Sequence, residues 1–351
     1  MSFSLSKLTG LAVLITPSLA TYTLSDEYNS TNFFDKFNFW DTNVNADPTK
    51  GFVKYLPRDQ AEQAGLISTT GTNAIMRVDN TSYPQDGRAS VRVQSNTVYN
   101  QGLFLLDLDH MPHGCGTWPA FWMVGPDWPK HGELDIIENV HEASSDLVTL
   151  HTDNGCNLAK TGAFTGKPGN TNCAYQPGCG VDAANPNSYG INFNNNGGGV
   201  YATEWNSDAL SIWFFPRDAI PADISAGAPT LAGWGPPMAQ FYKSGCNIDQ
   251  YFADMQIVFN IDFCGEWAGE ANVWGASCSQ KAATCEQWVS GTPSAFTAAY
   301  WSVRTLKVYT ETADVAAHNS TAANPKLAAP NALFVEKPAS GPAAEVSSSD
   351  P

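Results

Sequence analysis

The most restrictive feature of this sequence is a group of three carboxylates, Glu133, Asp135 and Glu138, that lie within six residues. On an α-helix the outer two side chains would diverge by about 140°, and the β-branched Ile136 and Ile137 favour a strand instead. On a regular strand Glu133 and Asp135 share one face, whereas Glu138 points to the other. A β-bulge at Ile136-Ile137 brings all three acids to one face. We therefore expect a bulged strand with the carboxyl groups of Glu133 and Glu138 close together.

Two neighbouring carboxylates can break a glycosidic bond. At a separation of about 5–5.5 Å, one attacks the sugar while the other acts first as acid and then as base, so that the anomeric configuration is retained. The charge on one carboxylate keeps its neighbour protonated for the first step. Trp118, Trp122 and Trp128 precede the acids, and indole faces can stack on sugar rings as well as fill a core.

Two other interpretations of the acids remain open. Three acids on a strand also occur on ordinary solvated faces. A metal site would combine Glu133 and Asp135 with His131 and His141, but the chain lacks the His-Glu-x-x-His spacing typical of such centres. We expect neither a metal nor a cofactor.

The segment Gly132-Glu133-Leu-Asp135-Ile-Ile-Glu138 resembles the Glu-x-Asp-x-x-Glu signature of glycoside hydrolase family 16, especially its fungal endo-1,3(4)-β-glucanases, or laminarinases. The resemblance covers about residues 25–311. Further segments that resemble blocks of this family are residues 32–40, 87–92, 114–122, 150–152, 197–205, 212–217 and 263–269.

This resemblance implies a role for each matching residue. Glu133 corresponds to the nucleophile, Glu138 to the acid/base and Asp135 to an assisting carboxylate. Glucan-binding residues are expected at Trp122, Trp128, His151 and Trp267. The implied fold is an all-β jelly-roll sandwich of the concanavalin A type, with a long substrate cleft on its concave sheet.

Two further residues complete the expected substrate-binding set. In the alternating run 89–93 we expect Arg88 or Arg92 to reach the cleft, with a solvated strand face as the alternative. Glu204, in the family-like block 197–205, is also placed among the substrate-binding residues.

Short alternating segments with Gly and Asn turns independently favour an all-β sandwich. Residues 200–205 and 211–215 predict a hairpin with its turn at 206–208. Residues 256–262 and 301–309 predict later strands. We assign a catalytic domain to residues 21–311, and the Ala/Pro/Ser-rich residues 312–351 to a disordered tail.

Residues 1–20 resemble a secretory signal peptide, with Lys7 before a short apolar segment and small residues up to Ala20. We expect cleavage after Ala20 and a secreted, extracellular protein, with an uncleaved anchor as the alternative. The sequence has 8 cysteines, which suit an oxidising compartment and allow 105 pairings. Local bridges Cys173–Cys179 and Cys278–Cys285 are plausible. Asparagines that begin glycosylation sequons are Asn29, Asn80 and Asn319.

The net charge of −16 and the pI of about 4.6 disfavour binding to nucleic acid or to anionic membranes. The chain suits a neutral polysaccharide, and we expect a monomer.

The sequence thus predicts a secreted, retaining endo-β-glucanase that hydrolyses β-1,3-glucans, including mixed β-1,3/1,4 or 1,6-branched polymers. One alternative is a β-glucan transglycosylase on the same scaffold. Another is a non-catalytic glucan-binding protein, which could keep the tryptophans but would not need both Glu133 and Glu138.

Overall fold

The computed structural model describes residues 21–159 and 162–312. The predicted signal peptide (1–20) and nearly all of the predicted tail (313–351) lie outside this part of the chain. Within it, every helix is too short or too polar to traverse a bilayer.

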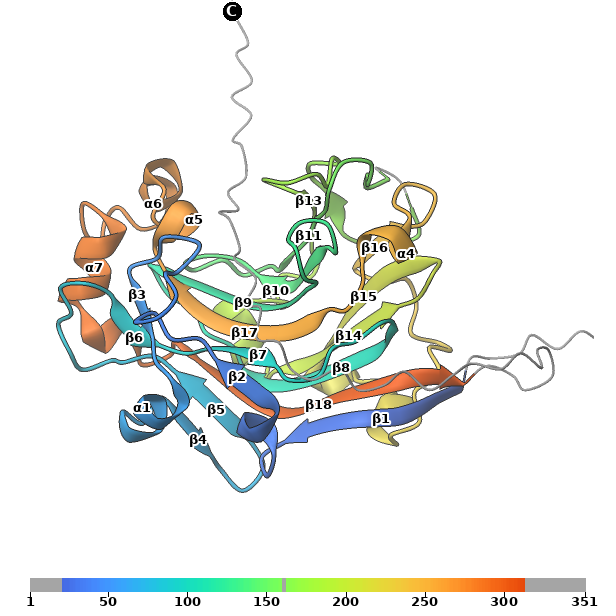
Figure 1. Ribbon diagram of the computed structural model, residues 1–351, viewed down its shortest axis with the longest axis horizontal. Helices are drawn as coiled ribbons and strands as arrows, with labels where there is room; N and C mark the ends of the chain where they lie inside the picture. Colours follow the sequence, from blue (N-terminus) through green and yellow to red (C-terminus); the bar gives the residue numbers. More distant parts are fainter. Residues whose placement is uncertain (1–20, 160–161, 313–351) are drawn as a thin grey trace, which may run out of the picture.

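Two eight-stranded antiparallel sheets are stacked face to face as curved layers (Figure 1). In the first, the strands run in the order β16-β15-β14-β8-β18-β5-β4, and β1 also pairs with β18. Its strands are β1 (Thr21–Asn29), β4 (Ile67–Thr69), β5 (Ala74–Arg77), β8 (Gly102–His110), β14 (Gly199–Trp205), β15 (Ala209–Pro216), β16 (Ala239–Tyr242) and β18 (Tyr300–Thr312).

The second sheet has the order β12-β13-β11-β10-β9-β17-β7-β2 and carries the predicted acidic strand near its middle. Its strands are β2 (Phe37–Phe39), β7 (Arg92–Ser95), β9 (Thr117–Val124), β10 (Glu133–Glu138), β11 (Leu147–His151), β12 (Lys167–Pro168), β13 (Cys179–Asp182) and β17 (Gln256–Phe263). A separate parallel pair joins β3 (Val53–Tyr55) to β6 (Arg88–Ser90). The predicted all-β sandwich is confirmed.

The helices are short and lie in the connections between strands (Figure 1). The α-helices are α1 (Arg58–Gln63), α2 (Gly190–Asn195), α3 (Ala222–Ser225), α4 (Ile248–Tyr251), α5 (Gly265–Ala268), α6 (Ala271–Ser277) and α7 (Cys285–Gly291). Three 3-10 helices are η1 (Phe33–Lys36), η2 (Arg217–Ala219) and η3 (Pro293–Phe296).

The main core fills the space between the two sheets. Alternate residues of β17, Ile257, Phe259 and Ile261, point into it and are fully buried. The Phe259 ring contacts the rings of Phe121 and Trp301, with centroids 4.6 and 5.7 Å away. Full burial of such side chains stabilises the fold by about 1.5–3 kcal/mol each.

The predicted hairpin is confirmed as β14 and β15, and the side chain of Asn206 forms its turn. The side-chain Oδ1 of Asn206 accepts hydrogen bonds from the backbone N–H groups of Asp208 and Ala209, at 2.9 and 3.0 Å. The expected single run 89–93 is instead divided between β6 and β7. The first part pairs with β3 and the second with β17, so the two belong to different sheets.

Four disulfides link the described cysteines. Cys173–Cys179 is confirmed, whereas the expected Cys278–Cys285 pair is wrong. Cys278 pairs with Cys115, and Cys285 pairs with Cys264, because helices α6 and α7 fold back on the ends of β9 and β17 (Figure 1). The fourth bridge joins Cys156 to Cys246.

His141 lies in the connection that leaves β10 and is buried there. Its Nδ1 accepts a hydrogen bond from the backbone N–H of Gly116 at 3.0 Å, and its ring meets that of Trp274 at a centroid distance of 5.5 Å. Burial lowers the pKa of His141 to about 4. Its φ of 62° lies in the left-handed region, which Asn also tolerates.

We predict that His141 makes folding sensitive to acid. An unfolded histidine takes up a proton near pH 6.5, so between pH 6.5 and 4 the unfolded state binds more protons than the folded state. The free energy of unfolding should therefore fall as the pH drops through this range. In His141→Asn, an acceptor for Gly116 remains but titration is removed. When urea unfolding is measured across this pH range, the free energy of unfolding of the wild type should fall by up to about 3 kcal/mol more than that of the variant. Equal losses would contradict this role.

Candidate active site

The strand β10 contains the predicted bulge. Glu133 lies opposite Val124 of β9, and Asp135 lies opposite Trp122. The register then shifts, so that Ile136 is the additional residue and Glu138 lies opposite Ala120. Because directly opposed residues share a face, all three acids project on the side of Ala120, Trp122 and Val124. The predicted bulge is confirmed.

That side is the outer face of the second sheet. Ala120, Trp122 and Val124 form an apolar cluster with Val258, against which the half-buried Trp128 packs. The neighbouring residues of the two strands belong instead to the main core; they are Phe121, Met123, Leu134, Ile136 and Ile137. The bulge therefore lets both isoleucines pack inward while the acids point outward.

Indole N–H groups hold the two outer acids. Trp128 Nε1 donates to Glu133 Oε2 at 2.7 Å, and Trp118 Nε1 donates to Glu138 Oε1 at 2.8 Å. Both carboxyl groups are almost completely buried. Each of these hydrogen bonds offsets part of the cost of burying a polar group.

Asp146 supports the backbone of Glu138 from inside the fold. Its Oδ1 accepts a hydrogen bond from the backbone N–H of Glu138 at 3.0 Å, and its own N–H donates to Ser188 Oγ at 2.9 Å. Burial raises the pKa of Asp146 well above its ordinary value. The sequence analysis missed this residue because a single Asp before a strand gives no signal of contact with another strand.

His151, in β11, lies directly opposite Glu133. Its Nδ1 lies 2.8 Å from the backbone oxygen of Tyr175, so Nδ1 carries a proton and donates. The other nitrogen, Nε2, lies 3.4 Å from Asp135 Oδ2 and 4.0 Å from Glu133 Oε1. A proton on Nε2 or on the Asp135 carboxyl group would bridge the shorter of these two distances.

In the structure, the residues that could hold a metal ion differ from those considered from the sequence. Ligand atoms of Glu133, Asp135 and His151 all lie within 4.8 Å of one another. His131 and His141 do not join them, because His131 Nδ1 contacts the Pro126 oxygen and His141 accepts from Gly116. The imidazole and the two carboxylates can equally exchange protons among themselves.

The predicted aromatic residues lie around the acids. Trp128 packs on the outer-face cluster, with its ring centroid 6.5 Å from that of His151. Trp122 Nε1 donates to Asn260 Oδ1 at 2.7 Å. Trp267 meets Trp118 edge to face at 5.5 Å, and Trp118 binds Glu138. The structure thus brings together the acids, His151 and all three tryptophans.

A small pocket adjoins Glu138 on the side of β17. It includes Arg92, whose guanidinium lies 5.1 Å from the centre of the Trp122 ring. Asn260 and Asp262 were not among the predicted site residues, although their alternation with apolar residues in β17 repeats the pattern of β10. The pocket is lined by Thr49, Tyr55, Arg92, Trp118, Ala120, Trp122, Glu138, Asn260 and Asp262.

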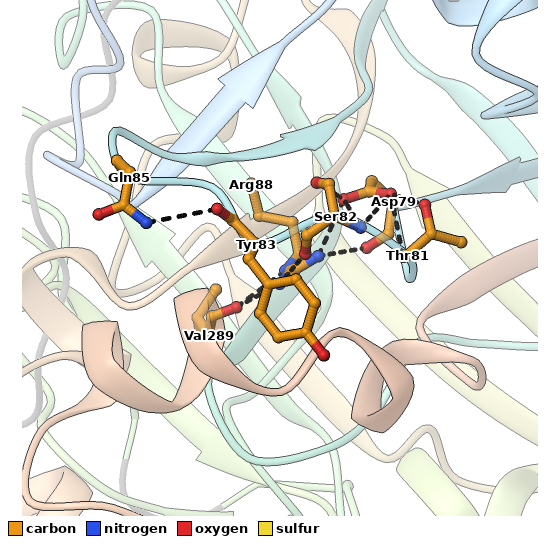
Figure 2. Close-up of polar contacts among 7 residues, drawn as sticks. All are labelled: Asp79, Thr81, Ser82, Tyr83, Gln85, Arg88 and Val289. Carbon is orange, nitrogen blue, oxygen red and sulfur yellow. Dashed lines mark hydrogen bonds and ion pairs between the residues drawn. The ribbon is translucent and has the colours of Figure 1, made fainter.

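The structure contradicts the prediction that Arg88 binds substrate. Figure 2 shows its side chain between the segment after β5 and the helix α7. The guanidinium donates to the backbone oxygens of Asp79, Ser82 and Val289 and to the Asp79 carboxylate. Arg88 is fully buried, so these contacts give it a structural role.

The prediction for Glu204 is also wrong, because Glu204 belongs to the other sheet. It lies on β14, and its side chain accepts a hydrogen bond from Tyr22 Oη at 2.7 Å. Tyr22 and Ala202 belong to an apolar cluster on the outer side of that sheet. The main core therefore separates Glu204 from the acids.

The sequons remain predictions. The side-chain Oδ1 of Asn29 accepts hydrogen bonds from the backbone N–H and the hydroxyl of Thr31, at 2.9 and 2.7 Å. Asn80 is partly buried beside Asp79. Asn319 lies outside the described residues.

Comparison with known proteins identifies similar sequences over most of the chain. Residues 37–309 match the family described as XgeA-like, catalytic GH16 domain. A probable glycosidase of Schizosaccharomyces pombe is 44% identical over 296 residues, which are 82% of this chain and 69% of the relative. An endo-1,3(4)-beta-glucanase of Arthroderma benhamiae is 42% identical over 300 residues, which are 83% of this chain and 65% of the relative. The chain thus spans only about two thirds of the length of these relatives.

Two solved structures are similar over their whole length. GH16 Laminarinase 16A from Phanerochaete chrysosporium, described with two beta-glucans in donor and acceptor sites, is 39% identical, with a TM-score of 0.79. The match covers 83% of this chain and 100% of that one. An elongating GH family 16 beta-1,3-glucosyltransferase is 39% identical, with a TM-score of 0.77, and the match covers 82% and 100% of the two chains.

We predict that Arg88→Ala destabilises the fold without changing glucan binding. The substitution removes the donors to the Val289 oxygen and to the Asp79 carboxylate, although Asp79 keeps its hydrogen bonds from Thr81 and Ser82, and it should cost about 1–3 kcal/mol in urea unfolding. Lys54→Ala is the control, because its ion pair with Asp86 is exposed and should contribute no more than about 1 kcal/mol. A change in the KM of folded Arg88→Ala for glucan, with stability unchanged, would restore the substrate-binding role.

Proposed function

The chain belongs to glycoside hydrolase family 16, and from this premise we propose that it is a secreted endo-1,3(4)-β-glucanase with a retaining mechanism. One observation carries the proposal: the bulge in β10 brings Glu133, Asp135 and Glu138 to the outer face of one sheet. The similar proteins named endo-1,3(4)-beta-glucanases support the choice of substrate.

In the first step, a Glu133 oxygen attacks the anomeric carbon of a glucose unit, and the bond from that carbon to the leaving sugar's oxygen breaks. Glu138 donates its proton to that oxygen. In the second step, Glu138 takes a proton from water, whose oxygen attacks the same carbon and releases Glu133. The two inversions retain the anomeric configuration, and each carboxyl group returns to its starting state.

The neighbouring residues orient these groups. Trp128 and Trp118 donate hydrogen bonds to the two glutamates, and Asp146 holds the backbone of Glu138. Asp135 lies between the two glutamates in sequence, and its carboxyl group contacts His151. We propose that Asp135 and His151 together orient the nucleophile Glu133 and exchange protons beside it. Trp128, which is half-buried, supplies an aromatic face for a glucose unit, whereas Trp122 and Trp267 are buried and pack beside the acids.

The same intermediate also allows transfer to a second sugar. The similarity to an elongating β-1,3-glucosyltransferase favours this as the second candidate function. An acceptor hydroxyl would then replace water in the second step, with Glu138 again taking the proton. The chemistry of the first step is unchanged.

Four disulfides within the described residues support an extracellular location, because such bonds persist in oxidising compartments. The acidic composition suits a neutral polymer, and we propose a monomer. Linear β-1,3-glucans are the central substrate, and mixed-linkage or 1,6-branched polymers belong to the same proposed range.

We predict that Glu133→Gln abolishes the release of reducing ends from laminarin while preserving folding and glucan binding. Glu138→Gln should do the same on laminarin. It should recover part of its turnover on an aryl glucoside whose leaving group needs no proton, and Glu133→Gln should not. Near-wild-type turnover in either variant on laminarin would show that the assigned roles are wrong.

Proton NMR of the first products should show the β-anomer before mutarotation, as retention requires. Chromatography at rising oligosaccharide concentration separates the two candidate functions, because products longer than the substrate indicate transfer. An initial α-anomer would exclude the proposed double displacement.

A further inference from the structure

A short loop, residues 173–179, lies against the candidate site and presents an exposed aromatic ring. The Cys173–Cys179 disulfide closes this loop. Its backbone is also fixed to the end of β11, since Thr152 N–H donates to the Cys173 oxygen at 2.8 Å and Tyr175 N–H donates to the Thr152 oxygen at 2.9 Å. Tyr175 has a φ of 53°, which the loop holds in the left-handed region.

The backbone of this loop touches the ring of His151. The Tyr175 oxygen accepts the Nδ1–H of His151, and a Cβ added to Gly178 would lie only 2.7 Å from the same ring. His151 Nε2 in turn lies 3.4 Å from Asp135 Oδ2. A single imidazole ring therefore separates the loop backbone from the row of acids.

The side chain of Tyr175 is exposed yet held in place. The residue is 45% exposed, and its hydroxyl donates to Asp153 Oδ1 at 2.9 Å. On the other side of His151, the Trp128 ring lies 6.5 Å from the imidazole ring. The segment that carries Trp128 and the loop that carries Tyr175 therefore both lie beside His151.

We propose that Tyr175 is a sugar-contacting residue whose ring stacks on a glucose unit of the β-glucan, on the side of the acids where β11 and β13 lie. An aromatic ring carried by a loop whose backbone is fixed can bind the apolar face of a pyranose with little loss of conformational entropy. The inference rests on the proposed function for its ligand class, a β-1,3-linked glucose polymer. Tyr175 thereby helps to set the affinity for chains that extend past the acids.

Calorimetric titration with laminarihexaose tests the proposal in the Glu133→Gln background, where turnover is expected to be absent. We expect Tyr175→Ala to weaken binding about tenfold. Tyr175→Phe should stay within about twofold of the parent, because the ring remains while the bond to Asp153 is lost. Tyr83→Ala is the control, since Tyr83 is 68% exposed and lies on the segment that Arg88 links to α7 (Figure 2).

Unchanged affinity in Tyr175→Ala overturns the inference, as does an equal loss in Tyr175→Phe, which would assign the effect to the hydroxyl. In the active parent, Tyr175→Ala should raise KM for laminarin while the pH profile of kcat stays in place, because the carbonyl contact to His151 is retained. A shifted profile with unchanged affinity would assign a structural role instead. Binding by a parent that releases no reducing ends would defeat the proposed function while leaving Tyr175 as a glucan contact.

Discussion

One additional residue in β10 decides where the acidic groups of this protein lie. In a regular strand, Glu138 would point between the sheets, where Ile137 and Phe121 now pack. A carboxylate there would lose its hydration and cost several kcal/mol without a partner. With Ile136 as the additional residue, the strand gives apolar side chains to the core and all three acids to the outer face.

The acids can be buried on that face because neighbouring residues form hydrogen bonds and polar contacts with them. Indole N–H groups bind both glutamates, His151 lies beside Asp135, and Asp146 accepts the Glu138 N–H from within the fold. These partners come from β9, from β11 and from the connections on either side of β10, so three neighbouring strands of one sheet set their relative positions. This arrangement restricts the motion of the carboxyl groups, as glycosidic chemistry requires.

Features that depend on the spacing of residues near one another in the chain could be predicted from the sequence. The bulge followed from two adjacent isoleucines between acids, the hairpin from an Asn-Ser-Asp turn, and Cys173–Cys179 from proximity along the chain. Features that depend on the order of strands in the sheets could not be predicted. Glu204 and Arg88 both lie in family-like segments, but strand pairing sends Glu204 to the opposite sheet, and a helix near the C-terminal end of the domain covers Arg88. The wrong Cys278–Cys285 pair has the same cause.

The two disulfides at the helical end have a consequence for how this fold can change. The Cys115–Cys278 and Cys264–Cys285 disulfides attach the segment that contains α5, α6 and α7 to the ends of β9 and β17. Trp267 lies just after Cys264. Lengthening a loop between fixed ends is inexpensive, with about 0.6 kcal/mol for each doubling. Insertions between these anchors can therefore accumulate during evolution while Trp267 stays in register with the acids. Because its ends are held by disulfides, the α5–α7 segment is a region where a new preference for a polymer can arise while the strands that carry the acids stay unchanged.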